Sequence, residues 1–430
     1  MTDIQKENKS GGKVPNNPKK ISNLRFPEFE GEWEVKKLGE VMDFKVTNSF
    51  SRENLNYEYG TVKNIHYGDI HTKFQTLFDI NCESVPFINE EIDISRISDE
   101  NYCKNGDIIF ADASEDLNDV GKSIEIINTN GEKLLSGLHT LLARPKKDIF
   151  HLGFSGYLFK SNSVRTQIQK ESQGSKVLSI NVGRISKVEL SFPSVEEQSK
   201  ISSFLALLDE RIQTQSKIIE QIEFYFKGIK DNLFSQKIRF GDFADDWKTK
   251  KLGDVLLKNS TKNKNQRYST VQSVSNKYGF INQEDIFEDR RVASVDTSNY
   301  YVIDKGCFAY NPSRINVGSL AYKFDDKISI ISPLYISFKA ENIFLIDTFL
   351  LYWFKTIEFT KQMNNSFEGS VRNTLSYENL IKMNISIPSL EEQIQISSFL
   401  TKIDQKIQTE KTILEQLEMQ KKYLLQQMFV

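Results

Sequence analysis

The chain has 430 residues, of which 39 % are hydrophobic and 27 % charged, and its formal net charge is −2 at pH 7. This length allows two or three domains with substantial cores. The near-neutral charge excludes a nucleic-acid binder that relies on bulk positive charge, so any such function must be local or shared with a more basic partner. No apolar run approaches the roughly 18 residues of a membrane span, so we expect no membrane segment.

The first 22 residues are predicted to be a disordered arm. Residues 1–22 are polar and contain no apolar run that would form a secretory signal. The cysteines, Cys82, Cys103 and Cys307, match no zinc spacing and form no pattern with the histidines. Scattered thiols in odd number indicate a reducing compartment, so we expect a cytoplasmic protein without a metal site.

The rest of the chain is a repeat. Residues 25–41 (RFPEFEGEWEVKKLGEV) return as residues 239–255 (RFGDFADDWKTKKLGDV), displaced by 214 positions. Residues 193–234 return as residues 388–429, displaced by 195 positions. Each half is a variable block followed by a long helical block, and the helical blocks resemble each other more than the variable ones do. This pattern is typical of a fixed scaffold that presents two different binding modules.

The repeat predicts four segments after the arm. They are a first mixed α/β domain over 23–192, a central spacer helix over 193–237, a second mixed α/β domain over 238–387 and a C-terminal spacer helix over 388–430. Within the variable blocks, short β-like runs alternate with turn signals. In the second part of each variable block, corresponding residues are again displaced by 195 positions. The length difference of 19 residues between the blocks therefore lies in their first parts.

Both helical blocks carry a heptad pattern, in which seam positions alternate steps of four and three residues. The first seam is Ile201, Leu205, Leu208, Ile212, Gln215, Ile219, Ile222, Phe226, Ile229 and Leu233. The second seam is Ile396, Leu400, Ile403, Ile407, Glu410, Leu414, Leu417, Lys421, Leu424 and Met428. Each block opens with Pro-Ser and then Glu-Glu-Gln, which favours a helix start because acids stabilise the positive end of the helix dipole.

The simplest partner for each seam is the other seam. A helix of about 40 residues is roughly 60 Å long, and antiparallel pairing would place one variable block at each end. Gln215 and Glu410 share a repeat position, where a polar contact would set the register. An ordinary two-helix bundle core is the alternative interpretation. We therefore expect an α+β fold, in which two mixed α/β domains are joined by two long helices forming an antiparallel coiled coil with an internal pseudo-twofold repeat.

No catalytic or nucleotide-binding motif is recognisable in the sequence. The chain lacks a P-loop, a Gly-x-Gly-x-x-Gly turn, a Gly-x-Ser-x-Gly elbow and a His-Glu-x-x-His helix. Residues 311–314 (NPSR) lack the second proline and the stacking ring of the Asn-Pro-Pro-aromatic motif of amino-methyltransferases, so a flipped base would have no platform there. The sequence favours a binding protein over an enzyme.

Polar loops of the second block are candidate DNA contacts. Residues 310–319 follow a predicted strand and are too polar for a core. Arg314 and Asn316 carry side chains that pair with guanine and adenine edges, and Ser313 and Ser319 suit phosphate or base contacts. A solvated turn is the alternative. Neighbouring loops add Lys277, Tyr278, Arg290, Arg291 and Arg372, where Arg290-Arg291 is equally compatible with a solvated pair.

The corresponding loop of the first block, residues 112–122, is acidic, which weakens the analogy between the blocks. We predict that Ser114 and Lys122 in this loop contact DNA. Other polar loops of the first block add Lys63, Asn64, Tyr67 and Lys176.

These features resemble a known family. Two variable domains, each followed by a helix that opens Pro-x-x-x-Glu-Gln-x-x-Ile, are similar to the specificity subunit of type I restriction–modification systems (HsdS). The openings are residues 193–201 and 388–396. The stretches YGDIHTKF (67–74) and YNPSRINVGSL (310–320) are similar to stretches common in the target recognition domains of that family. The resemblance covers about residues 25–430.

The resemblance implies a role in DNA recognition. Each target recognition domain would read one half of a bipartite, asymmetric double-stranded DNA sequence, and the helices would space the halves. Two methyltransferase subunits would dock on the helices, and motor/nuclease subunits would complete the restriction enzyme. S-adenosylmethionine, ATP and Mg²⁺ would bind those partners, so we expect no cofactor in this chain. A scaffold that binds protein or glycan ligands, and an enzyme with an unrecognised motif, are the alternatives.

Overall fold

The computed structural model describes residues 21–146, 149–284, 296–367 and 373–430. The arm expected over residues 1–22 lies almost wholly outside these ranges, as do Arg290, Arg291 and Arg372. Contacts divide the chain into unit 1, comprising Met1–Gln215 and Ile413–Val430, and unit 2, comprising Ser216–Thr412. Each unit thus holds one variable block and part of both helical blocks. No helix in the described ranges is long and apolar enough to cross a bilayer.

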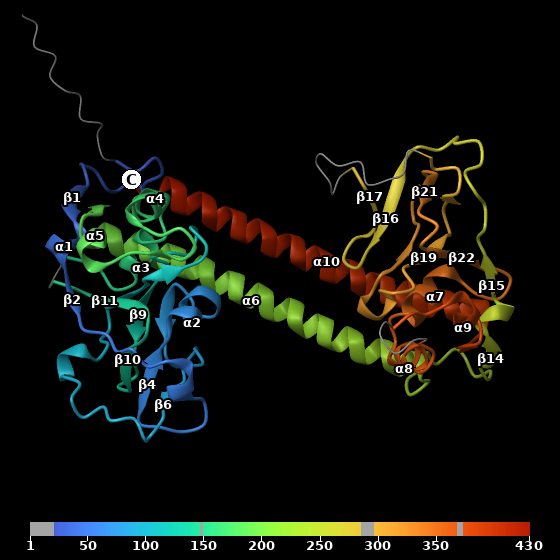
Figure 1. Cartoon of the computed structure of the whole chain (residues 1–430), viewed down its shortest axis with the longest axis horizontal. Helices are drawn as coiled ribbons and strands as arrows, with labels where there is room; N and C mark the ends of the chain where they lie inside the picture. Colours follow the sequence, from blue (N-terminus) through green and yellow to red (C-terminus); the bar gives the residue numbers. More distant parts are fainter. Residues whose placement is uncertain (1–20, 147–148, 285–295, 368–372) are drawn as a thin grey trace, which may run out of the picture. The chain divides into compact units, whose positions relative to one another are not determined.

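The centre of unit 1 is a five-stranded sheet with the order β2-β11-β7-β9-β5. Figure 1 labels β2, β11 and β9 of this sheet. Its strands are Met42–Lys45 (β2), Thr140–Pro145 (β11), Ile108–Ala111 (β7), Ser123–Asn128 (β9) and Leu77–Asp79 (β5). Neighbours are antiparallel, except for the parallel pair β5 and β9. Strand β7 is buried on both faces, because alternate residues enter two different core clusters. This burial explains why the run IIFA shows no polar alternation.

A second sheet of unit 1 has the order β10-β4-β6-β3. Its strands are Lys133–Ser136 (β10), Val62–Ile65 (β4), Phe87–Ile88 (β6) and Leu55–Asn56 (β3). Strands β10 and β4 are parallel. Two small antiparallel ladders pair β1 (Glu34–Lys37) with β13 (Glu189–Phe192) and β8 (Ala113–Ser114) with β12 (Leu178–Ser179).

Short helices cover the sheets of unit 1. They are α1 (Leu38–Val41), α2 (Tyr67–Thr72), α3 (Phe154–Leu158), α4 (Asn162–Glu171) and α5 (Val182–Ile185), with 3-10 turns at Arg52–Asn54 and Asp99–Asn101. Side chains cap α4 and α5: Ser161 accepts the N–H of Val164, and Asn181 accepts that of Arg184. Each cap satisfies a donor that the first helical turn leaves without a partner, which fixes where the helix begins.

Unit 2 has the same plan. Its main sheet has the order β15-β22-β19-β20, with strands Leu256–Lys258 (β15), Ile336–Ala340 (β22), Phe308–Tyr310 (β19) and Leu320–Tyr322 (β20). Its second sheet has the order β17-β16-β21-β18, with strands Gly279–Asn282 (β17), Val271–Ser275 (β16), Ser329–Ile331 (β21) and Tyr301–Ile303 (β18). The remaining elements are β14 (Lys248–Lys251) paired with β23 (Asn384–Ile387), α7 (Asp347–Trp353), α8 (Ile357–Asn365), α9 (Tyr377–Leu380), and 3-10 turns at Leu252–Asp254 and Ile315–Val317.

The two units confirm the internal repeat and the mixed α/β class of each domain. The order β2-β11-β7-β9 corresponds to β15-β22-β19-β20, and the parallel pair β4 and β10 corresponds to β16 and β21. Helices α3, α4 and α5 correspond to α7, α8 and α9. The units differ in the element that comes directly after β4 or β16, because β4 leads into helix α2 whereas β16 turns back as strand β17.

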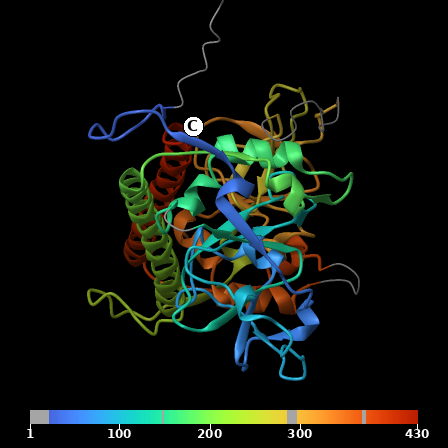
Figure 2. The ribbon, with the colours of Figure 1, turned by 90° about the vertical axis from the view of Figure 1, so that its left-hand side faces the viewer.

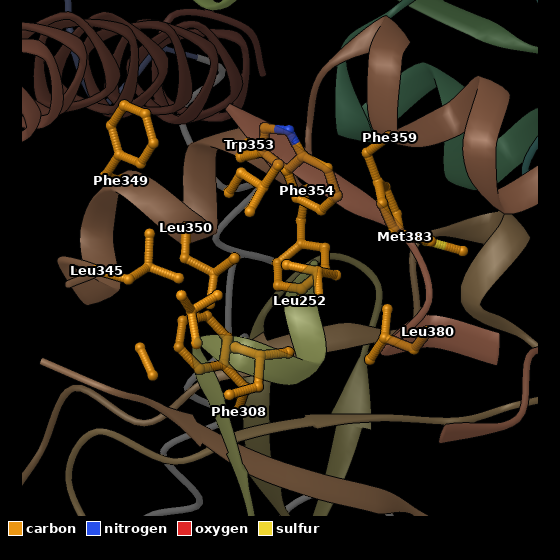
Figure 3. Close-up of a cluster of buried hydrophobic side chains, with 14 of the residues drawn as sticks. Leu252, Phe308, Leu345, Phe349, Leu350, Trp353, Phe354, Phe359, Leu380 and Met383 are labelled. Atoms are coloured by element: carbon orange, nitrogen blue, oxygen red, sulfur yellow. The ribbon is translucent and has the colours of Figure 1, made fainter. Parts of the chain in front are cut away.

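A cluster of buried side chains joins the main sheet of unit 2 to helices α7 to α9 (Figure 3). The rings of Phe308 and Phe338 stack at 5.3 Å, with 2° between their planes, and Phe354 lies 6.0 Å from each. Aromatic pairs add about 0.5–1.5 kcal/mol beyond the buried area. The cluster therefore anchors β19 and the start of the polar loop after it.

The long helices are α6 (Val195–Phe234) and α10 (Leu390–Gln427). Every predicted seam position from Ile201 to Leu233 and from Ile396 to Met428 is buried or half-buried, whereas most positions between them are exposed. Gln215 and Glu410 are buried as well. The polar contact expected between them stays a prediction.

Within unit 1, the first part of α6 packs on the last part of α10. Leu205 shares a core cluster with Leu424, and Asp209 forms an ion pair with Lys421. Because later residues of α6 meet earlier residues of α10, the two helices are antiparallel here. Figure 2 shows them side by side at the flank of unit 1.

Unit 2 contains the complementary parts of both helices, again antiparallel. Leu233 near the end of α6 shares a cluster with Leu400 near the start of α10, and Glu223 pairs with Lys411 at 2.6 Å. The antiparallel pairing expected from the heptads is thus present within each unit.

The Glu-Glu-Gln motif fastens the start of each long helix. Glu197 in α6 is 1 % exposed and accepts two hydrogen bonds of 2.7 Å from the Arg25 guanidinium. Gln198 makes three bonds to the backbone around it, two of them to the segment before α3. Arg239, Glu392 and Gln393 repeat this arrangement in unit 2. A buried carboxylate needs such a bidentate partner, so the repeated arginine and glutamate belong to one structural feature.

Candidate nucleic-acid interface

The same two loops lie together in both units. In unit 1 the N–H of Ile180 donates to the carbonyl of Asp112 at 2.8 Å, and in unit 2 the N–H of Leu375 donates to the carbonyl of Pro312 at 3.0 Å. Each bond joins the loop after the central strand, β7 or β19, to the segment that leads into α5 or α9. In unit 1, β12 also pairs Leu178 with Ser114, so the exposed Lys176 lies close in the chain to this predicted contact.

Helix α2 brings two more predicted contacts of unit 1 together. Tyr67 opens this helix, and Lys122 donates from Nζ to the carbonyl of His71 in the same helix at 2.6 Å. His71 Nε2 lies 3.2 Å from the carbonyl oxygen of Ala113, next to Ser114. The structure thus brings Tyr67, Ser114 and Lys122 to one surface, although 55 positions separate the first from the last.

Three histidines surround Tyr67, and the sequence reasoning missed them as contacts. The centroid of the Tyr67 ring lies 4.6 Å from that of His66, 5.3 Å from His139 and 5.9 Å from His71. Two of the three, His66 and His71, lie in or beside the stretch YGDIHTKF. This stretch was the sequence signal that could have identified them as contacts. The third, His139, approaches only through folding. Histidine and tyrosine both offer hydrogen-bonding groups and rings for contacts with bases or phosphates.

Burial shifts the pKa of His66 in this cluster and that of Asp112 beside it. Burial lowers the pKa of His66, and the neighbouring Arg52 lowers it further. A neutral imidazole agrees with the geometry, because His66 Nδ1 accepts the N–H of Gly68 at 3.2 Å and so caps α2. Asp112 lies 3.2 Å from His139 Nδ1, and burial raises the pKa of this carboxyl group.

Two predicted contacts of unit 1 have other roles. Lys63 pairs with Glu132 at 2.7 Å, and its ammonium lies 5.3 Å from the centroid of the Phe87 ring. Asn64 is 0 % exposed, and its side-chain oxygen accepts a bond from Asn48 at 2.7 Å. As a predicted contact, Asn64 had to lie at the surface. This placement is wrong, because β4 is a central strand that buries the Asn64 amide.

In unit 2, three predicted contacts stand on an exposed loop. Ser313, Arg314 and Asn316 are exposed between β19 and β20. Within the part of the chain that the structure describes, the side chains of Arg314 and Asn316 have no hydrogen bond or ion pair, so their donors face solvent. Ser319, in contrast, is 3 % exposed, and its expected surface position is wrong because it leads directly into β20.

The turn between β16 and β17 lies beside this loop. A Cβ atom built on Gly318 would lie 3.9 Å from the Cβ atom of Asn276 in the turn. Lys277 and Tyr278 come next in the same turn, with the ammonium 5.0 Å from the centroid of the ring, and Tyr278 is 68 % exposed. The structure therefore brings Lys277 and Tyr278 close to the loop that carries Arg314 and Asn316.

A groove of about 550 Å³ opens next to this turn in unit 2. Its walls come from the β16–β17 turn, from the segment 320–325, and from α7 and the first half of α10. Lys277 and Lys355 both line it. Asp325 and Asp404 line it as well, so its walls carry charges of both signs.

The chemistry available on these surfaces is that of binding. Among the described residues, no group of three His, Cys, Asp or Glu side chains could hold a metal ion. Burial raises the pKa of the Cys307 thiol to about 12, and burial also raises that of Cys103, so neither thiol is an activated nucleophile. The exposed groups are guanidinium, ammonium, amide, hydroxyl and aromatic side chains, which are those used against nucleic-acid bases and phosphates.

A family model agrees with this interpretation. The model of the type I restriction modification DNA specificity domain matches the chain twice, over residues 30–224 and 244–419. Each match spans one variable block and most of the long helix after it. Together the two matches cover most of the chain.

Two curated relatives match most of the chain. The putative type I restriction enzyme MjaX specificity subunit of Methanocaldococcus jannaschii is 24 % identical over 428 residues, which cover 93 % of this chain and 93 % of the relative. The type I restriction enzyme MjaVIII specificity subunit of the same organism is 25 % identical over 290 residues, covering 63 % of this chain and 68 % of that relative.

Solved structures share the fold. The S subunit of a type I restriction–modification system from M. genitalium superposes with a TM-score of 0.56 at 15 % identity, covering 95 % of this chain and 99 % of that chain. A chain from a study of complex assembly and conformational transition in the type I system superposes with a TM-score of 0.55 at 15 % identity, covering 91 % and 96 %.

Proposed function

Because the chain belongs to the type I restriction modification DNA specificity family, we propose that each of its units reads one half of a bipartite, asymmetric DNA target. The chain is a specificity subunit with two recognition domains and is not itself a catalyst. DNA and the other subunits of a restriction–modification complex are therefore its partners in general terms. The proposal adds to these general partners that each unit reads a different half of the DNA target.

One observation carries the proposal: the two units share a scaffold but differ in their exposed loops. The loop after β7 (residues 112–122) is acidic and lies against helix α2, whereas the loop after β19 (residues 311–319) carries Arg314 and Asn316 and lies beside the β16–β17 turn. Different donors and acceptors select different base edges. Two unlike readers on one scaffold would recognise an asymmetric target.

The long helices would space the two half-sites and dock two methyltransferase subunits. The continuous heptad seam supports the spacer role, since a paired helix resists bending better than a loop. Motor/nuclease subunits would join the complex for restriction. S-adenosylmethionine, ATP and Mg²⁺ would be bound by these partners, in the cytoplasm where the DNA lies.

Selection from a random duplex pool tests the proposal. The chain would be purified with its methyltransferase partner, mixed with a pool of random-sequence duplexes, and the bound DNA sequenced. We expect an enriched motif of two short, unlike blocks separated by a fixed number of unspecified base pairs. A single continuous motif, or no enrichment from a complex that is assembled and binds DNA, would contradict the proposal.

A further inference from the structure

The surface of unit 1 beside α2 carries two cations that the sequence reasoning did not select. Arg52 lies in the 3-10 turn before β3, and Lys73 comes directly after the last residue of α2. Both side chains are about half exposed, at 44 % and 51 %. Both pair with the same oxygen, Oδ1 of Asp69, at 2.7 Å for Arg52 and 3.0 Å for Lys73. One carboxylate thus holds two exposed cations in place.

Asp69 fixes these cations from inside the fold. Its side chain is 0 % exposed, and its second oxygen, Oδ2, is buried without a hydrogen bond among the described residues. A buried carboxylate is tolerated only when cations or donors compensate it. Asp69 therefore needs Arg52 and Lys73, and in return it determines where their charges lie. The three side chains carry two positive charges against one negative.

Tyr57 completes the cluster on the solvent side. Its hydroxyl group accepts hydrogen bonds from Arg52 Nη1 at 3.4 Å and from Lys73 Nζ at 3.1 Å. The Lys73 ammonium also lies 5.4 Å from the centroid of the Tyr57 ring. Hydrogen bonds to Tyr57 and Asp69 raise the pKa of Lys73, so this group stays cationic at neutral pH. Each cation keeps N–H donors that no described residue uses, because a guanidinium has five donors and an ammonium three.

The cluster borders the predicted reading surface. Asp69 and Lys73 belong to the same short helix and its cap as Tyr67, the predicted contact that lies among the histidines. Arg52 is within reach of that surface, because a Cβ atom on Gly68 would lie 3.5 Å from its Nη2 atom. Two preorganised cations therefore flank the residues expected to contact bases.

We propose that Arg52 and Lys73, held by Asp69 and Tyr57, form a phosphate clamp that binds the DNA backbone next to the half-site read by unit 1. The inference rests on the proposed function, since it requires DNA to lie along α2. Such a clamp adds affinity but no sequence preference, because the phosphates are alike at every base pair. It also places local positive charge at the DNA in a chain whose net charge is −2.

Salt dependence of binding tests the clamp. Arg52→Gln, Lys73→Gln and the double variant would be assembled with the methyltransferase partner. Each complex would be titrated with a duplex carrying the selected target and with a random-sequence duplex, over a series of KCl concentrations. Each lost phosphate contact should reduce the slope of log K against log [salt] by about 0.9. The reduction should be the same for both duplexes, so the ratio of their affinities should not change.

Lys36→Gln is the matched control, because Lys36 is a lysine in unit 1 with a 38 % exposed side chain that pairs with Glu34 at 2.8 Å on β1. Its slope should equal that of the wild type, as should that of the charge-preserving variant Arg52→Lys. If the double variant fails to fold, Lys73→Gln alone keeps the test available, because its ammonium lies outside the core.

Two results would overturn the clamp: a wild-type slope in the folded variants, or a changed ratio between the duplexes at unchanged slope, which would indicate base reading. The failure of the proposed function looks different. In that case the duplex selection with the wild-type complex would itself return a single continuous motif or no motif, whatever the salt slopes of the variants.

Discussion

At the scale of single residues, Glu125 links the main sheet of unit 1 to helix α3. Its side chain is 1 % exposed on β9, and its two oxygens accept the N–H groups of Gly153 and Gly156 at 2.6 Å each. Burial raises the pKa of Glu125 to about 7, although the two N–H groups oppose this shift. The protonated form is therefore favoured in the folded chain more than in the unfolded chain.

This shift predicts a pH dependence of stability. A carboxyl group with a raised pKa contributes its full stability below its unfolded value of 4.5, and loses that contribution as the pH rises through about 7. The loss amounts to about 3 kcal/mol. Urea unfolding between pH 5 and pH 8 should show the decline in the wild type and not in Glu125→Gln. The exposed Glu34→Gln variant is the control and should behave as the wild type does, and parallel curves for wild type and Glu125→Gln would contradict the assignment.

Sequence reasoning located exposed contacts better than buried ones. Arg314 and Tyr278 are exposed as expected, because a polar run after a buried strand has no core to enter. Asn64 was misplaced because an amide can be buried in a central strand when another side chain, here that of Asn48, satisfies it. His139 escaped notice because its contact with Tyr67 spans 72 positions and leaves no local pattern.

At the scale of elements, the long helices could be predicted from the sequence, but the side-chain contacts that anchor their N-terminal ends could not. A heptad is a local pattern, so the seam positions of α6 and α10 could be read directly from the sequence. The bond between Arg25 and Glu197 joins residues 172 positions apart, and only its recurrence as Arg239 and Glu392 hinted at it. The lysine at seam position 421 is accommodated by its ion pair with Asp209, which no periodicity reveals.

The spacer role of these helices predicts the effect of an insertion. One heptad added to each of α6 and α10 keeps the seam in phase and lengthens each helix by about 10 Å, or roughly three base pairs of B-DNA. The selected target should then keep both half-sites and gain a longer gap. Inserting two residues into each helix instead rotates the rest of the seam by about 200°, away from its partner, and should impair folding. A seven-residue variant that is folded but selects the original gap would refute the spacer role.

At the scale of the whole molecule, the N-terminal segment of each unit is hydrogen-bonded to the C-terminal end of a long helix. In unit 1 the N–H of Leu24 donates to the carbonyl of Gln427 at 2.9 Å, and in unit 2 the N–H of Ile238 donates to the carbonyl of Asn232 at 3.3 Å. These bonds occupy equivalent positions of the repeat. Unit 1 therefore uses the end of α10 where unit 2 uses the end of α6, so each unit is completed by a segment from the other half of the sequence.

The central claim is that each unit reads its own half of the target, and exchanging one variable block tests it most directly. Residues 36–190 would be replaced by the variable block of another specificity subunit, which leaves Arg25, Glu197 and both long helices unchanged. Sequencing the duplexes selected by the assembled complex should show one new half-site, with the other half-site and the gap retained. A target that changes in both halves, or in neither, would contradict the account.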